Sequence, residues 1–477
     1  MMQWKTTALL LVITIGIGTY VSLYELKQPT PEERERRSRQ VIAVSPATVT
    51  RLELALPQAA AMVTREGTTW RIIPARVRAD PERIERILRD ADPLMAERVL
   101  TGTPDEPLDP SAFGLAPPVG RITVHAEGAP TTFLLGETTA VNGNRYLQVA
   151  GHPEVFVVPP ALFEDANHPA DALRDPLLIR LDPWAVDGLT VAAPAGTLAL
   201  ARTDNAWTLT QPLQDRADRA EVNELLRKLA EIRIRRFVDD HPQIEGAASW
   251  GFEPPALEVT VRQGTPAVST TLVFGAALPD DAALVYAKRS DEPPLYAVAA
   301  QDLEPLRREP HGLRERACFQ FFADLASRVE VTREGAEWAI ERTDGRWREA
   351  GSSREVESAR VEKWFGKLAE LRLSGFEEDA PGDLARYGLE PPAGAITVHT
   401  TDRDEPQRLL IGSTVAGSAS RYGRIEGRTA VVRLPESVVE LLAPLADEAA
   451  GPEGALQDGE VGQQGQQDQR PPEEVMP

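Results

Sequence analysis

A short motif occurs three times along the chain, and it constrains the fold more than any other feature. An aromatic residue, a glycine, an apolar residue, one further residue and two prolines follow one another at 113–118, 250–255 and 387–392. The spacing between the motif glycines is 137 residues both times, which predicts three tandem repeats. Glycine can end a helical turn in the left-handed conformation and the prolines prevent further helix, so the motif predicts a turn leading into an extended segment. Its residues are Gly114, Pro117, Pro118, Gly251, Pro254, Pro255, Gly388, Pro391 and Pro392.

A β-hairpin is predicted ahead of each motif, from alternating apolar and polar residues around a polar turn. A tryptophan closes each hairpin, at Trp70, Trp207 and Trp347. An arginine stands five residues before each tryptophan, at Arg65, Arg202 and Arg342. We interpret the tryptophans as core anchors rather than a sugar-stacking platform. We expect the arginines to cover a neighbouring strand and pair with a carboxylate, with a row of guanidinium groups that binds an anionic partner as the alternative.

One amphipathic helix is predicted after each hairpin. Asp80, Asp218 and Glu357 stand where a carboxylate can cap the first amides of a helix. Apolar residues then recur at helical spacing at 84–94, 222–232 and 361–371, and strands follow each motif. Each repeat is therefore expected to be a hairpin, a helix and an antiparallel meander. The predicted fold class is α+β, with three tandem α+β repeats between an N-terminal transmembrane helix and a disordered tail.

The predicted domains follow from these patterns and from the length of 477 residues, which suggests about three domains. They are a short N-terminal tail at 1–5, a transmembrane signal anchor at 6–24, a polar stalk at 25–45, repeat 1 at 46–170, repeat 2 at 171–318, repeat 3 at 319–447 and a disordered acidic Gly/Gln/Pro tail at 448–477. The segments between repeats carry apolar residues rather than Gly and Ser, so we expect them to pack. Any functional surface is expected where repeats meet.

The stretch 6–24 contains no charged residue, and as a helix its 19 residues nearly match a hydrocarbon core of about 30 Å. We expect an uncleaved, single-pass anchor in the inner (cytoplasmic) membrane; Gly16-Ile17-Gly18 is a weak cleavage signal. The basic residues that follow the stretch favour a cytoplasmic body, whereas a short tail ahead of a large body is the usual signal-anchor layout. We expect the bulk of the chain to be periplasmic.

Composition and motifs exclude several kinds of chemistry. The formal net charge of −21 argues against nucleic acid as a partner, and one cysteine, Cys318, excludes an internal disulfide and a cysteine-based zinc site. No phosphate loop, Gly-x-Ser-x-Gly elbow or His-Glu-x-x-His motif occurs. We interpret His125 and His399 as surface residues rather than metal ligands, and the acidic residues at 239–240 and 377–379 as solvated loops rather than calcium sites. No catalytic residue, cofactor or metal is predicted.

The repeated motif, the Trp-ended hairpin, the Leu-Gly or Phe-Gly strand ends and the Trp-Lys-Thr-Thr start resemble bacterial proteins that contain the domain of unknown function DUF4340, from residue 1 to about 447. The resemblance implies a membrane-anchored protein that is associated with gliding-motility-type ABC transporter components, and it gives no catalytic residues. We therefore expect a non-enzymatic interaction or accessory protein at the cell envelope, with the lipid bilayer and ABC transporter subunits as partners. The alternative is an extracytoplasmic protein or enzyme that binds cell-envelope polymer, which a groove lined by aromatics and paired carboxylates would favour.

Overall fold

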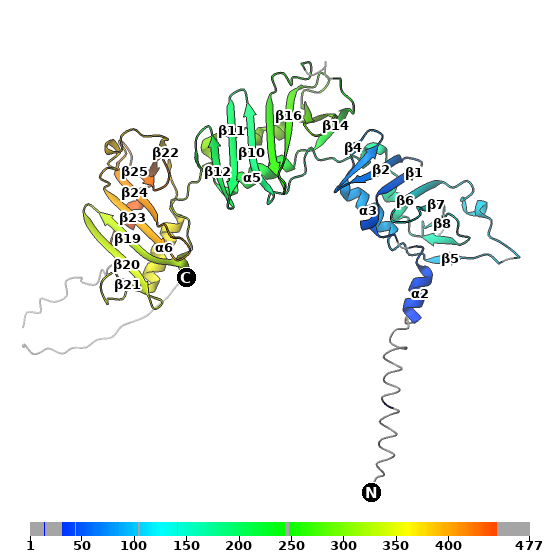
Figure 1. Cartoon of the computed structure of the whole chain (residues 1–477), viewed down its shortest axis with the longest axis horizontal. Coiled ribbons are helices and arrows are strands. Elements are labelled where there is room, and N and C mark those ends of the chain that lie inside the picture. Colours follow the sequence, from blue (N-terminus) through cyan, green and yellow to red (C-terminus); the bar gives the residue numbers. More distant parts are fainter. Residues whose placement is uncertain are drawn as a thin grey trace, which may run out of the picture. The chain divides into compact units, whose positions relative to one another are not determined.

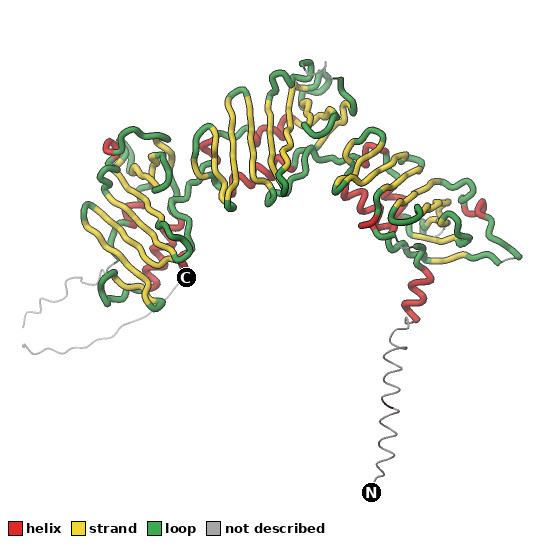
Figure 2. The backbone as a smooth tube through the Cα atoms, viewed as in Figure 1, coloured by secondary structure: helices red, strands yellow, loops and turns green. Residues whose placement is uncertain are grey.

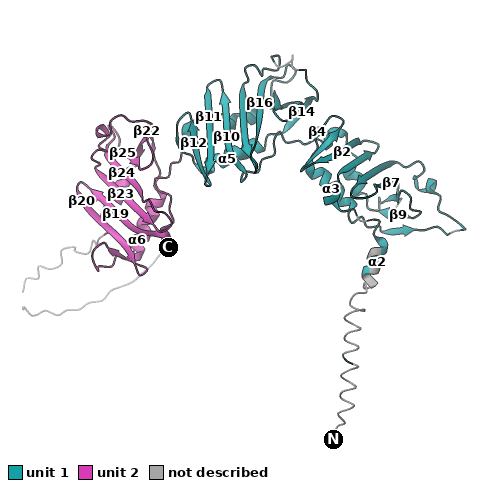
Figure 3. Ribbon diagram, viewed as in Figure 1, with its two compact units in different colours: residues 1–314 teal, residues 315–477 magenta. Residues whose placement is uncertain are grey.

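The computed structural model describes residue 14 and residues 31–445, except 43, 104, 141 and 244–247. The chain divides into two compact units, residues 1–314 and residues 315–477 (Figure 3). Repeats 1 and 2 lie in the first unit, and repeat 3 lies in the second.

Each repeat is built on one large antiparallel sheet with few helices (Figure 1 and Figure 2). Repeat 1, with the segment before it, contains α2 (Pro31–Arg39), η2 (Pro46–Thr48), β1 (Arg51–Ala55), β2 (Ala60–Glu66), β3 (Thr69–Ile73), β4 (Val77–Arg78), α3 (Pro81–Ala91), β5 (Arg98–Leu100), η3 (Pro110–Phe113), β6 (Gly120–His125), β7 (Thr131–Thr138), β8 (Arg145–Val149), β9 (Val155–Val158), α4 (Ala161–Ala166) and η4 (Ala170–Leu173). Its strand order is β4-β3-β2-β1-β6-β7-β8-β9-β5.

Repeats 2 and 3 use the same strand order. Repeat 2 contains β10 (Val186–Ala193), β11 (Gly196–Thr203), β12 (Ala206–Gln211), β13 (Asp215–Arg216), α5 (Arg219–Ala230), β14 (Ile234–Asp239), β15 (Leu257–Gln263), β16 (Val268–Ala277), β17 (Leu284–Arg289), β18 (Leu295–Ala299), η6 (Ala300–Leu306) and η7 (Pro310–Leu313). Repeat 3 contains η8 (Ala323–Leu325), β19 (Ala326–Arg333), β20 (Ala336–Thr343), β21 (Arg346–Glu349), α6 (Ser358–Glu370), β22 (Gly375–Glu378), η9 (Ala385–Tyr387), β23 (Gly394–Thr400), β24 (Gln407–Thr414), β25 (Arg421–Ile425), β26 (Val431–Leu434) and α7 (Val438–Leu441).

The predicted α+β class is wrong, because hairpin and meander form one continuous sheet. Strand β1 pairs with β6, β10 with β15 and β19 with β23, so that Leu52 lies opposite Val124. The strand after each helix, β5, β14 or β22, joins the opposite edge of the same sheet. Alternating residues mark each strand, but they do not show which distant strand completes its hydrogen bonds.

The predicted N-terminal membrane helix has no counterpart in the part of the chain that the structure describes. Its span at 6–24 lies outside the described residues apart from residue 14, as do the tails at 1–5 and 448–477. Among the described helices, none is long and apolar enough to cross a membrane. Helix α2 occupies part of the predicted stalk, and Val41 donates a backbone hydrogen bond of 2.9 Å to Leu94 of repeat 1.

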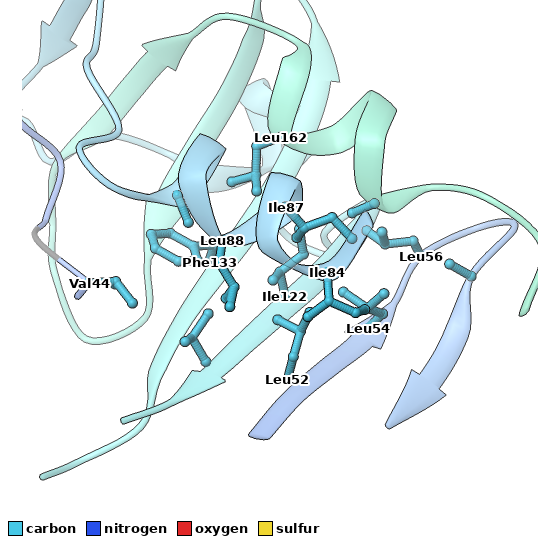
Figure 4. Packing of buried hydrophobic residues seen from close by; sticks show 14 of the residues in the cluster. Val44, Leu52, Leu54, Leu56, Ile84, Ile87, Leu88, Ile122, Phe133 and Leu162 are labelled. Carbon is cyan, nitrogen blue, oxygen red and sulfur yellow. The ribbon is translucent and has the colours of Figure 1, made fainter. Parts of the chain in front are cut away.

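The main helix of each repeat packs its apolar stripe against the sheet. In repeat 1, Ile84, Ile87 and Leu88 of α3 lie among the side chains of the β1 and β6 strands (Figure 4). The predicted buried stripes are confirmed in all three helices. The caps are confirmed in two, where Asp80 and Asp218 accept hydrogen bonds from backbone amides of α3 and α5. The cap predicted at Glu357 is wrong, since its side chain makes no such bond.

The segments between repeats are part of the folded structure. Asp175 N donates to Arg78 O of repeat 1 at 3.0 Å, and Leu178 N donates to Ile232 O of repeat 2 at 3.0 Å. Leu178 and Ile179 are buried in the core of repeat 2. The apolar linker residues therefore complete the core of the following repeat, which leaves this linker little freedom.

Cys318 provides a probe of the second unit. The thiol is buried in the core of repeat 3, and this burial raises its pKa to about 12. Because the thiolate is the reactive form, we expect Cys318 to resist iodoacetamide in the native protein and to react at the ordinary rate in urea. Mass spectrometry of the labelled protein checks this. Rapid labelling without denaturant would contradict the burial.

Candidate functional site

The Gly-Pro-Pro turns have the same geometry in all three repeats. Gly114, Gly251 and Gly388 lie in the left-handed region, with φ of 67°, 72° and 64°. The first proline of each motif follows a cis peptide bond. The residue after each glycine bridges to the second proline: Leu115 to Pro118, Phe252 to Pro255 and Leu389 to Pro392. The motif is thus one rigid turn, built three times.

Each of these turns packs on a second glycine, in the third-from-last position or nearby of a meander strand. These glycines are Gly136 in β7, Gly275 in β16 and Gly412 in β24. A Cβ atom there would lie 2.3, 2.0 or 2.2 Å from the carbonyl oxygen of Phe113, Trp250 or Tyr387. The strand register shifts at the same place in each repeat. The repeated spacing was visible in the sequence, but the contact between the two glycine sites was not.

The three tryptophans and their arginines hold the entry of each hairpin. Trp70, Trp207 and Trp347 are buried in the three cores, as expected for core anchors. The guanidinium carbons of Arg65 and Arg202 lie 5.5 Å from the ring centroids of Trp70 and Trp207.

The same arginines bind backbone carbonyls rather than the expected carboxylates. Arg65 Nη1 donates to Ala47 O at 3.2 Å, and Arg202 Nη1 donates to Pro183 O at 3.3 Å. Arg342 Nη1 donates to Asp324 O at 2.8 Å. Each arginine therefore fixes the segment that leads into its own sheet.

A cluster of charged side chains joins repeats 1 and 2 inside the first unit, and we call it the ionic junction. Arg78 of β4 lies at its centre: Nη1 donates to Asp175 Oδ2 at 2.7 Å, and Nε lies 3.1 Å from both oxygens of Glu292. Its Nη2 donates to the carbonyls of Leu177 and Leu178 at 2.9 and 3.1 Å. The side chains of Asp175 and Glu292 are only 3% and 1% exposed.

Repeat 2 contributes a second arginine to the ionic junction. Arg289 Nη1 donates to Leu178 O at 2.7 Å, and its Nε lies 3.1 Å from Glu292 Oε1 and 2.9 Å from Asp291 Oδ1. The Tyr296 hydroxyl donates to Glu292 Oε1 at 2.8 Å. Burial, together with the Glu292 carboxylate, raises the pKa of Tyr296, so this hydroxyl remains a donor at neutral pH.

Arg180 completes the ionic junction from the linker. Its Nε and Nη2 lie 3.0 Å from the two oxygens of Asp175, and Nη2 lies 3.3 Å from the helix cap Asp80. A smaller buried pair follows repeat 2, where Arg314 Nε donates to Asp215 Oδ2 at 2.6 Å. Buried charges in this protein are thus used where one repeat passes into the next.

The histidines and acidic segments singled out in the sequence have ordinary partners. His125 Nε2 lies 2.9 Å from Glu53 and His399 Nε2 lies 3.8 Å from Glu330. The acidic residues at 239–240 and 377–378 lie on or beside the edge strands β14 and β22, where Asp240 pairs with Arg174, Glu378 with Arg386 and Glu377 with Arg433. Within the described residues, no group of three or more histidines, cysteines or carboxylates could hold a metal ion.

Asp90 and Asp165 form a carboxylate pair in repeat 1. Burial raises the pKa of Asp90 to about 6, and the neighbouring Asp165 raises it further. The folded state therefore binds a proton more tightly than the unfolded chain, and stability falls as the pH rises from about 4 to 6.

We accordingly expect Asp90→Asn to raise the stability at pH 7 by about 1 kcal/mol, a figure reduced for partial solvent exposure, and to leave stability at pH 4 unchanged. Urea unfolding of repeat 1 at the two pH values measures the difference. The exposed Asp105→Asn serves as the control and should show no such pH dependence. An equal effect of Asp90→Asn at both pH values would contradict the raised pKa.

The comparisons with known proteins agree with the repeats. The family described as domain of unknown function (DUF4340) matches residues 70–244, 207–363 and 350–449. No curated protein and no solved structure matches the chain. The matches together span most of the described residues.

Proposed function

This chain belongs to the DUF4340 family, and on that premise we propose that it is a non-enzymatic interaction protein that offers tandem sheets to a partner protein. The observation that carries the proposal is the ionic junction. Its arginines and carboxylates bind one another and the linker carbonyls, which makes repeats 1 and 2 a single surface. A catalytic site would instead direct such groups into a pocket toward a substrate.

The location and the identity of the partner remain predictions from sequence. We propose attachment to the cell envelope and a membrane protein as partner, with ABC transporter subunits as the class that the family resemblance implies. The apolar stretch at 6–24 and the acidic composition support this proposal. The alternative of polymer binding rests on paired carboxylates, and Asp90 with Asp165 is one such pair.

The test is co-purification of the full chain from mild detergent, with and without crosslinking. We expect one membrane protein to be captured in fixed stoichiometry by the wild-type chain. Arg78→Met, which breaks the ionic junction, should weaken the capture, whereas the exposed Arg227→Ala should not. Binding of purified envelope polymer without any stoichiometric protein partner would favour the alternative.

A further inference from the structure

Repeat 2 has an open apolar groove at one end of its sheet. Its volume is about 520 Å³, and it lies between the end of β10, the start of β15 and the segment after η6. Apolar side chains form most of its wall, and Arg307, Arg308 and Glu309 stand at its rim. The apolar members include Val191, Ala193, Leu198, Leu257, Leu306 and Pro310.

The corresponding position in repeat 3 shows what such a groove holds. Val191 pairs with Leu198 in repeat 2, and Val331 pairs with Trp338 in repeat 3, so Trp338 is the counterpart of Leu198. The Trp338 indole donates from Nε1 to the carbonyl of Leu442 at 3.3 Å. The hollow that remains in repeat 3 lies beside this indole and extends to Val356. Repeat 2 therefore lacks an indole that repeat 3 supplies from its own chain.

Repeat 2 also carries an exposed indole of its own. Trp184 precedes β10 and is 71% exposed. It stands at the opposite end of β10 from the groove, and an eight-residue strand spans about 26 Å, so it cannot fill the groove of its own chain. The exposed Asp182 lies two residues before it, and the groove rim carries the exposed Arg307. The aromatic segment and the groove are thus complementary in shape and in charge.

We propose that the groove of repeat 2 binds Trp184 of a second copy of this chain. The indole enters beside Leu198, and the carbonyl of Leu306 takes the place that Leu442 has in repeat 3. Asp182 of the entering copy faces Arg307. This inference rests on the proposed interaction role, because it names one partner of that surface as the chain itself.

Sedimentation velocity of the full chain in mild detergent, over a concentration series, tests the proposal. We expect the wild type to self-associate, and both Trp184→Ala and Leu198→Trp to weaken this association by at least about 30-fold. The first variant removes the indole, and the second fills the groove as repeat 3 does. A mixture of the two should form a one-to-one complex, since each variant keeps the half that the other has lost. Phe322→Ala, which removes another exposed aromatic side chain, is the matched control and should associate like the wild type.

Three outcomes would overturn the proposal. They are a wild type that stays monomeric at its highest soluble concentration, association that persists in both variants, and a mixture that does not associate although both variants unfold like the wild type. Binding of a tryptophan-containing peptide by a monomeric wild type, blocked by Leu198→Trp, would assign the groove to a different partner. If self-association fails while the membrane partner is still captured, only this inference is lost and the proposed function stands.

Discussion

Replacing Arg78 by alanine is expected to lower the free energy of unfolding of the first unit by about 3–5 kcal/mol. The side chain neutralises Asp175 and Glu292, which are almost completely buried, and it binds two linker carbonyls. Removing it leaves two carboxylates in a low dielectric without their main cation, and this costs more than the pair contributes when intact. Amide hydrogen exchange should show faster opening of the linker at 173–179 and of the loop before β18.

Arg227→Ala is the matched control for Arg78→Ala. Arg227 makes short ion pairs on helix α5, but its side chain is 51% exposed, so its loss should cost no more than about 1 kcal/mol. A second comparison separates charge from shape: Arg78→Met combined with Asp175→Asn and Glu292→Gln should recover part of the lost stability. If Arg78→Ala and Arg227→Ala unfold alike, the ionic junction does not stabilise the contact between repeats 1 and 2.

Gly412→Ala is expected to destabilise the second unit by about 1–3 kcal/mol. The new methyl group would lie 2.2 Å from the carbonyl oxygen of Tyr387, and both belong to backbone that is fixed by the Gly-Pro-Pro turn. The turn or strand β24 must therefore shift. Because Cys318 is buried in the same unit, its labelling should become about 5- to 150-fold faster.

Gly366→Ala provides the opposite expectation within the same unit. Gly366 lies on the exposed face of α6, and a Cβ atom there would meet nothing within 4 Å. Alanine should stabilise this helix by about 0.5–1 kcal/mol and slow the labelling of Cys318. Equal labelling rates in the two variants would show that the packing of the turn on Gly412 does not limit stability.

The sequence by itself determined the features that depend on neighbouring residues. The three repeats follow from the 137-residue spacing, and the family matches agree with them. The buried helix stripes and the caps at Asp80 and Asp218 follow from helical periodicity and from the first-turn amides. Glu357 shows the limit of this reasoning, because a carboxylate at the right position makes no cap bond when its side chain turns elsewhere.

Only the tertiary structure decided how distant residues meet. The pairing of β1 with β6 turned an expected α+β repeat into one continuous sheet, and alternation within a strand cannot reveal that pairing. Arg78 and Glu292 lie 214 residues apart, and neither has a local pattern that predicts the other. Burial makes their contact energetically important, and burial is a property of the assembled fold: the same side chains would be ordinary solvated charges in an open chain.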